Sequence, residues 1–463
     1  MRSPGARRLV LVLTFVTLSI ASATVDGGLP GARAQTVERP NIVLILTDDQ
    51  RFDTLKVMPN VRALAEDGMT LRRAIVTDPL CCPSRATILT GRFAHTTGVY
   101  ANQGTNGGWP AFQASEEDTI ATALDAAGYR TALIGKYINN YVGDDVYVPP
   151  GWDRWAAFAD FDGAYYDYEM LVNNRGIVSH GSSPSDYSTD VIRRLSTGFV
   201  RNTPTDTPLF LYAAPFAPHG PATAAPRDEG AFASTPVALN PAVNESDVSD
   251  KPAHIRARDR GSSAVVRREF RDQWESLLAV DHLVGRLVEV LTDTGRIDDT
   301  LFIFTSDNGF SNQEHRWIGK DVPYEVSIRV PMVISFPGTI PADTVSNALV
   351  SNVDLAPTIA DFAGASLTAD GVSLRPLLTD TASSARESIL LEHFERVTVP
   401  TYCGVRTPSF MFVHYATGEE ELYDLGDDPW QLRNVVASRP KKAMELRSLT
   451  ESLCQPTPPD FSW

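Results

Sequence analysis

The chain has 463 residues, of which 43% are hydrophobic and 21% are charged, and its formal net charge is −16. This length suits one large α/β domain with a smaller companion, and the composition excludes a wholly disordered chain. The negative charge excludes a nucleic-acid backbone as a favourable partner, so an anionic ligand needs a locally basic pocket.

The N-terminus has the pattern of an export signal. Arg7 and Arg8 precede the apolar run 9–21, and a small-residue cleavage pattern ends at Ala34. We therefore expect residues 1–34 to be a signal peptide and the protein to be secreted or extracytoplasmic. The run is short for a spanning helix, so no stable membrane insertion is expected. The arginine pair leaves Sec and Tat export open.

Four short apolar runs, each followed at once by polar residues, predict buried parallel strands. These runs are 41–47, 128–135, 208–214 and 300–305, and helical spacing of apolar residues predicts helices over 58–68 and 266–291. The alternation predicts an α/β fold with a large, mainly parallel sheet flanked by helices. Because the carboxyl ends of parallel strands share one edge, the polar residues after them should meet at one rim.

The pattern changes from about Arg386. Short strand-like runs and a final helix predict a small antiparallel-sheet subdomain over 386–463, after a catalytic domain over 36–385. Residues 219–263 have little periodicity and predict a long loop, which either shapes access to a site or is a surface insertion. In an exported protein Cys403 and Cys454 could form a disulfide; the alternative is two buried thiols.

Two pairs of oxygen-bearing residues follow predicted strands. Asp48 and Asp49 follow the first strand, and Asp307 and Asn308 follow the last. One such pair alone is typical of a turn or a helix cap. Two pairs at one sheet edge, with no Cys/His cluster nearby, predict a metal site for Ca²⁺ or Mg²⁺ rather than zinc.

Residues 80–92 read Leu-Cys-Cys-Pro-Ser-Arg-Ala-Thr-Ile-Leu-Thr-Gly-Arg. The contiguous Cys-x-Pro-Ser-Arg element, followed by Leu-Thr-Gly-Arg, matches the signature of the formylglycine-dependent (type I) sulfatases. The alternative is a buried cysteine pair where a turn meets a helix. Gly-Lys-Tyr at 135–137, Ala-Pro-His at 217–219, Thr-Ser-Asp-Asn-Gly at 305–309 and Gly-Lys at 319–320 extend the resemblance over nearly the whole mature chain.

The resemblance implies an alkaline-phosphatase-like fold with a small C-terminal sheet. It also implies that a formylglycine-generating maturase oxidises Cys81 to formylglycine (3-oxoalanine), Cys82 being the variable position. In this family a hydroxyl of the hydrated aldehyde attacks the sulfur of a sulfate ester, and the second hydroxyl expels sulfate. The residues that resemble the calcium ligands are Asp48, Asp49, Cys81, Asp307 and Asn308.

The same resemblance assigns the remaining catalytic roles. Arg85 resembles the residue that steadies the hydrated aldehyde, and Lys136 and Lys320 resemble the sulfate-binding lysines. For each lysine the alternative is a solvated surface charge. His219 resembles the histidine that contacts sulfate and protonates the leaving oxygen.

One position departs from the pattern of many arylsulfatases, which have a histidine two residues after the first lysine. Here Asn139 stands close by, and its amide can bind substrate but cannot act as a base. The base for sulfate release stays open between His95 and His219.

Segments 135–139 and 147–153 resemble those of N-acetylglucosamine-6-sulfatases and predict a sugar 6-O-sulfate as substrate. Nearby aromatic side chains either offer stacking faces for a sugar or pack in the core. They are Trp152, Trp155, Tyr165, Tyr166 and Tyr168. The alternatives are an arylsulfatase of broad specificity, a phosphate or phosphonate ester hydrolase on the same fold, and an inactive carbohydrate-binding relative.

Overall fold

The computed structural model describes residues 39–463 except 142–146, 160–162, 381–385 and 397. Residues 39–463 form one compact unit. The predicted signal peptide, 1–34, lies outside the described residues. Within the described part, no helix is both long and apolar enough to cross a bilayer.

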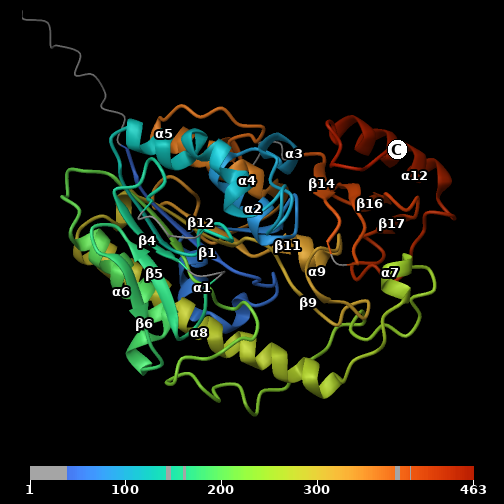
Figure 1. Ribbon diagram of the computed structural model, residues 1–463, viewed down its shortest axis with the longest axis horizontal. Helices are drawn as coiled ribbons and strands as arrows, with labels where there is room; N and C mark the ends of the chain where they lie inside the picture. Colours follow the sequence, from blue (N-terminus) through green and yellow to red (C-terminus); the bar gives the residue numbers. More distant parts are fainter. Residues whose placement is uncertain (1–38, 142–146, 160–162, 381–385, 397) are drawn as a thin grey trace, which may run out of the picture. The chain divides into compact units, whose positions relative to one another are not determined.

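An eleven-stranded mixed sheet forms the centre (Figure 1). Its order is β11-β2-β12-β8-β1-β7-β3-β4-β5-β6, and β13 also pairs with β2. The strands are β1 (Asn41–Thr47), β2 (Met69–Ile75), β3 (Arg130–Gly135), β4 (Arg154–Phe158), β5 (Tyr168–Val172), β6 (Gly176–His180), β7 (Leu209–Ala214), β8 (Thr300–Ser306), β11 (Arg329–Val330), β12 (Met332–Ser335) and β13 (Thr344–Ser351).

The predicted parallel arrangement holds for the middle of this sheet, where β8, β1, β7, β3 and β4 run parallel. Towards the edges it does not hold: β12 is antiparallel to both β8 and β2, and β5 and β6 are antiparallel to their neighbours. All seven residues of β1 are buried, because helices cover both faces of the sheet there.

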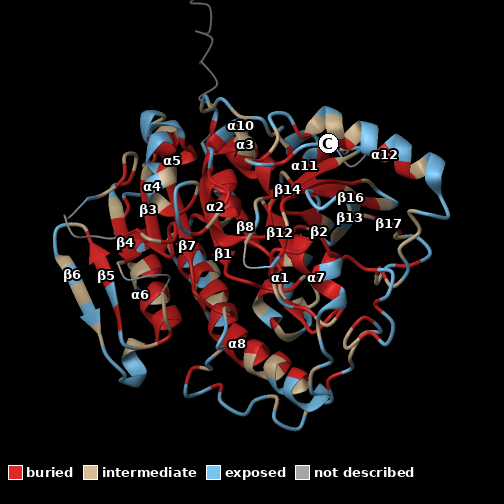
Figure 2. Cartoon of the chain, turned by 45° about the vertical axis from the view of Figure 1, so that its right-hand side comes forward, coloured by how far each residue is buried: buried red, intermediate tan, exposed pale blue. Residues whose placement is uncertain are grey.

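Alternate side chains of β1 enter two separate cores. Val43 and Ile45 pack with residues of α1, α6 and α8, whereas Ile42, Leu44 and Leu46 pack with residues of α2, α5 and α10. In Figure 2 the central strands are buried and the helices expose only their outer surfaces. The helices are α1 (Pro59–Glu66), α2 (Cys81–Thr90), α3 (Ala94–Thr97), α4 (Gly108–Phe112), α5 (Ile120–Ala126), α6 (Ser188–Arg201), α7 (Ala253–Arg256), α8 (Ser263–Asp293), α9 (Glu325–Ile328), α10 (Leu355–Ala363), α11 (Arg375–Thr379) and α12 (Pro440–Leu453).

A four-stranded antiparallel sheet with α12 forms the C-terminal part, as predicted (Figure 1). The sequence indicates strands at 389–392, 410–415 and 421–424, so the second strand of the sheet, β15, was not expected. The helix covers this sheet through Val405, Phe412, Leu422, Ala443 and Leu446. The strands are β14 (Ile389–His393), β15 (Tyr402–Arg406), β16 (Phe410–Tyr415) and β17 (Glu420–Asp424). The domain boundary at 385/386 stays a prediction.

The segment predicted as a long loop is anchored rather than loose. Residues 220–262 hold one short helix, α7, and pack against the turn that follows β9 (Ser311–Asn312). His315 N donates to Ala242 O at 2.9 Å, and the His315 ring contacts Glu245 at 2.6 Å. The turn after β9 continues through β10 (Ile318–Gly319) to Lys320.

Cys403 and Cys454 form a disulfide, which decides between the two alternatives in favour of the bond. It ties β15 to the end of α12 across a sequence separation of 51. Replacing both cysteines by alanine is expected to lower the free energy of unfolding by about 2–4 kcal/mol, because the unfolded chain loses a constraint.

Thermal unfolding at a fixed scan rate measures this effect. A reductant should lower the Tm of the wild-type protein and leave the Tm of the double variant unchanged. Equal Tm values for both proteins in oxidising buffer would contradict the prediction.

Candidate active site

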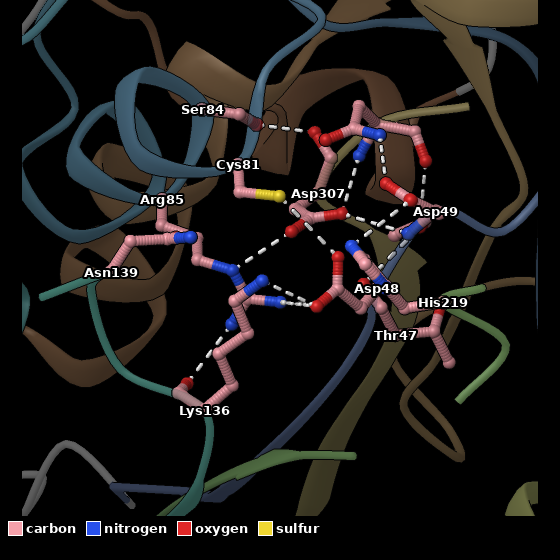
Figure 3. A network of polar contacts seen from close by, with 12 residues as sticks. Thr47, Asp48, Asp49, Cys81, Ser84, Arg85, Lys136, Asn139, His219 and Asp307 are labelled. Carbon is pink, nitrogen blue, oxygen red and sulfur yellow. Dashed lines mark hydrogen bonds and ion pairs between the residues drawn. The ribbon is translucent and has the colours of Figure 1, made fainter. Parts of the chain in front are cut away.

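Side chains from separate parts of the chain meet at the carboxyl ends of the central strands (Figure 3). Asp48 and Asp49 follow β1 directly, Lys136 follows β3, and Asp307 follows β8. His219 lies five residues after β7. The structure therefore brings the residues after all four predicted strands to one rim, as the parallel order requires.

Helix α2 carries Cys81 to this rim as its first residue, and all ten of its residues are buried. Pro83 lies in the first turn, where its missing N–H leaves no intrahelical bond unmade. The helix ends at Thr90, and Gly91 caps it with a φ of 68°, a value that favours glycine. Ser84 Oγ donates to the carbonyl oxygen of Asp307 and joins α2 to the β8 end.

The Cys81 thiol lies between a cation and a carboxylate. Lys320 Nζ donates to Cys81 Sγ at 2.7 Å, and Asp48 Oδ1 lies 3.5 Å from the same sulfur. Burial, with the negative charge of Asp48, raises the pKa of the thiol well above its usual value. As an unmodified thiol, Cys81 therefore stays protonated at neutral pH and is a poor nucleophile.

Three carboxylates crowd the same space. Asp49 N donates to Asp307 Oδ1 at 3.2 Å, and one ligand atom each of Asp48, Cys81 and Asp307 lies within 4.8 Å of the others. Burial and the charge of Asp48 raise the pKa of Asp307 to about 6. Burial also acts to raise the pKa of Asp48, but the cations around it, Lys136 first, hold it well below its usual range.

These residues fit a hard metal ion. Asn308 Nδ2 donates to Asp49 Oδ1 at 2.6 Å, whereas the buried Asn308 Oδ1 has no hydrogen-bond partner within the described chain. Carboxylate and amide oxygens are the ligands that Ca²⁺ and Mg²⁺ prefer. A bound cation would also offset the mutual repulsion of Asp48 and Asp307.

Three buried cations surround the carboxylates. Arg85 Nε lies 2.8 Å from Asp307 Oδ2, and Arg85 Nη1 donates to Lys136 O at 2.9 Å. Lys136 Nζ lies 2.5 Å from Asp48 Oδ2, and Lys320 Nζ donates to Asp49. Lys136 and Lys320 are 2% and 7% exposed. The alternative of solvated surface lysines is therefore wrong for both.

His219 lies on the open side of the cluster, with 27% of its side chain exposed. Its Nε2 is 3.6 Å from Asp49 Oδ2, and its Nδ1 lies 2.8 Å from the carbonyl oxygen of Gly220. That carbonyl can only accept, so Nδ1 carries the proton in this contact and Nε2 faces the carboxylates.

Two other predicted residues have recorded partners outside the carboxylate cluster. The His95 ring contacts Glu392 at 2.9 Å and stacks on Phe93; among the described residues it makes no recorded contact with the carboxylate cluster. Asn139 contacts the neighbouring cysteine, because its backbone N–H donates to Cys82 Sγ at 3.1 Å. Asn139 therefore contacts the residue next to Cys81, and its role in binding substrate stays a prediction.

The stacking-face interpretation is wrong for four of the five aromatic residues. Trp152, Trp155, Tyr165 and Tyr168 are buried, and Trp155 packs edge-on against Tyr137 at 4.9 Å between ring centroids. Tyr166 is partly exposed.

Sequence reasoning missed several supporting residues. Asn102 Oδ1 accepts from Cys82 N at 2.9 Å, and Asn352 Nδ2 donates to Ser84 Oγ at 3.0 Å. Both steady the start of α2 from distant segments. A lone asparagine carries no local sequence signal for such a contact.

The family described as "Sulfatase" matches residues 40–365, most of the chain. The chain belongs to the sulfatase family. This sulfatase also matches the description "N-sulphoglucosamine sulphohydrolase, C-terminal" over residues 313–456. It is therefore a sulfuric ester hydrolase, and its fold is the alkaline-phosphatase-like fold of its family.

Several relatives resemble the sulfatase over most of their length. An N-acetylglucosamine-6-sulfatase of Homo sapiens is 34% identical over 463 aligned positions, covering 88% of this chain and 83% of the relative. An N-acetylglucosamine-6-O-sulfatase of Bacteroides thetaiotaomicron is 29% identical, with 95% and 90% covered. A solved structure in complex with its substrate D-glucosamine-2-N,6-O-disulfate superposes with a TM-score of 0.80 at 27% identity, covering 91% of this chain and 99% of that one.

Proposed function

We propose that this sulfatase removes the 6-O-sulfate from an N-acetylglucosamine-like sugar in a glycosaminoglycan-like glycan. The observation that carries the proposal is the 34% identity, over 88% of the chain, to a relative named N-acetylglucosamine-6-sulfatase. The likeness to the solved structure that holds a 6-O-sulfated glucosamine supports it further.

The catalytic group in this proposal is residue 81 after conversion of Cys81 to formylglycine by a maturase. The hydrated aldehyde supplies the hydroxyl that attacks sulfur. The metal, for which we propose Ca²⁺, is held by Asp48, Asp49, Asp307, Asn308 and residue 81. When bound, it supplies positive charge that offsets the negative charge of the sulfate.

The side chains of the site provide the remaining functions. Lys136 and Lys320 are buried beside Cys81 and can neutralise the charge that grows on the sulfate oxygens. Arg85, fixed by Asp307 and the Lys136 carbonyl, orients residue 81. His219 is partly exposed beside Asp49, so we assign to its Nε2 the proton given to the leaving sugar oxygen.

The burial of the site favours a sulfate on a primary carbon. Cys81 and Lys136 are 1% and 2% exposed, so the sulfate must enter a recess. A 6-O-sulfate stands one carbon away from the sugar ring, and it can reach into a recess while the ring stays near the surface. We also propose that the protein acts outside the cytoplasm, because an export-signal pattern precedes the catalytic domain.

We expect kcat/KM for N-acetylglucosamine-6-sulfate to exceed kcat/KM for nitrocatechol sulfate by at least about tenfold. The reason is that polar contacts to ring hydroxyls and the acetamido group are lost with an aryl group, and unpaired polar groups are costly. Steady-state kinetics on fully matured enzyme measures both constants.

N-acetylglucosamine-3-sulfate serves as the matched control, since it has the same sugar with the sulfate on a ring carbon. Faster turnover of the aryl ester, without turnover of the 6-sulfate, would overturn the substrate assignment and leave the sulfatase activity in place.

A further inference from the structure

A pocket lined by four arginines lies outside the active site, where residues of the central sheet's edge meet residues of the C-terminal sheet. Its volume is about 320 Å³. Arg72 and Arg73 come from β2, Arg329 from β11 and Arg406 from β15. Glu325 is the one carboxylate among the lining residues, so four guanidinium groups against one carboxylate leave an excess of three positive charges.

Glu325 is already engaged by two of the arginines. Arg406 Nε donates to Glu325 Oε1 at 2.7 Å, and Arg329 Nη1 lies 3.8 Å from Oε2. Although burial acts to raise the pKa of Glu325, these arginines lower it, so the carboxylate is charged at neutral pH. Arg406 is 3% exposed and is therefore a buried, fixed cation in the pocket wall.

Arg72 and Arg73 supply charge that Glu325, already paired with Arg406 and Arg329, offsets only in part. Across the described part of the chain, neither guanidinium group makes a recorded hydrogen bond or ion pair. Arg72 is exposed and Arg73 is half-buried, so both can reach a ligand in the pocket. Burial lowers the pKa of Arg329; the charge of Glu325 acts to raise it, and the charges of Arg406 and Arg73 act to lower it. The arginines repel one another, and a bound anion would relieve that repulsion.

We propose that this pocket binds a sulfate-type oxyanion, either inorganic sulfate or a sulfate ester group of a polyanionic glycan. Guanidinium groups match tetrahedral oxyanions through paired, charge-assisted hydrogen bonds. The volume lies at the lower end of the range for small-ligand sites, which suits one sulfated sugar unit. A basic pocket of this kind is unexpected in a chain of net charge −16 unless it has a use.

The pocket is separate from the catalytic residues. None of its lining residues belongs to the carboxylate cluster or to the cations around Cys81. The proposal therefore holds whichever sulfate ester the active site hydrolyses.

The test compares Arg73→Gln with the matched control Arg62→Gln, since Arg62 is an exposed arginine outside the pocket. Isothermal titration calorimetry uses the full-length, matured enzyme and two probes at constant ionic strength. The first probe is sodium sulfate. The second is a heparin-derived tetrasaccharide with its 6-O-sulfates removed, which the proposed active site cannot hydrolyse.

We expect Arg73→Gln to weaken binding at one site by at least about tenfold, the effect of losing a charge-assisted contact, while Arg62→Gln binds as the wild type does. Weaker binding of both probes identifies the oxyanion itself as the ligand. Weaker binding of the tetrasaccharide alone identifies the glycan as its source. Turnover of nitrocatechol sulfate should be unchanged in both variants, which also verifies the fold.

A double variant, Arg72→Gln with Arg73→Gln, makes the result decisive. Its Tm in sulfate-free buffer should equal or exceed that of the wild type, because neither side chain has a recorded hydrogen bond or ion pair to lose in the described chain and the repulsion among the arginines falls. Its Tm should rise less than that of the wild type when sulfate is added. If both pocket variants bind both probes as Arg62→Gln does, the proposal is wrong.

Discussion

Replacing Cys81 with alanine is expected to lower the turnover of any sulfate ester by at least about 10⁴-fold, because the nucleophile is lost. The fold should survive, since alanine leaves the backbone bonds of α2 intact. Cys81→Ser is expected to stall after one sulfate transfer: serine has one hydroxyl, and the second hydroxyl that expels sulfate is missing. A pre-steady-state burst, followed by no further turnover, would mark this state.

Peptide mass spectrometry of the wild-type enzyme should find residue 81 as the aldehyde or its hydrate and Cys82 as a thiol. Cys82→Ala is the matched control, because its thiol is equally buried and contacts Asn139 Oδ1 at 3.2 Å. This variant should be converted at residue 81 and remain active. A fully active enzyme with an unmodified Cys81 would refute the proposed nucleophile.

The parts of the fold that could be predicted are those with local signals. The strands β1, β3, β7 and β8 are buried on both sides, so they appear in the sequence as uninterrupted apolar runs. Their ends place Asp48, Lys136 and Asp307, and the structure brings these residues together.

The edges of the sheet could not be predicted in the same way. Strand β12 has four residues, too few to display a periodicity, yet it separates β8 from β2 and reverses the direction of the sheet. Strand β13 alternates between exposed and partly buried positions over its first half, so it lacks an apolar run. Strand order follows from pairing between distant segments, and no local pattern encodes it.

Aromatic residues show the same limit. The sequence around Trp152 and Trp155 is compatible with either a sugar-binding rim or core packing. Only the contacts of these side chains in the folded protein decide between the two. The arginine pocket is a further case: Arg73 and Arg406 belong to different sheets, and each looks like an ordinary surface charge in its own segment.

Replacing Asp307 with alanine is expected to remove the metal and to lower kcat/KM by at least about 10³-fold, because the charge that the ion supplies to the sulfate is lost. The structure also predicts a cost in stability. Arg85 Nε lies 2.8 Å from Asp307 Oδ2 and both side chains are fully buried, so alanine leaves a buried cation with one partner fewer. Removing one partner of such a pair typically costs about 3–5 kcal/mol.

Asp307→Asn removes the charge at the metal site with less damage to the fold than alanine, although it too loses the contact of Oδ2 with Arg85. Asparagine keeps a carbonyl oxygen that can accept from the backbone N–H groups of Asp49 and Asn308, which Asp307 Oδ1 now binds at 3.2 and 2.8 Å. Asp53→Asn is the matched control, because Asp53 pairs with Arg51 at 3.1 Å and lies outside the carboxylate cluster. Plasma mass spectrometry should find about one calcium per chain in the wild type and in Asp53→Asn, and much less in Asp307→Asn. Full activity after removal of all metal would contradict the metal site. Stoichiometric zinc would contradict the choice of calcium, because the oxygen donors around Asp307 suit calcium, the harder of the two ions.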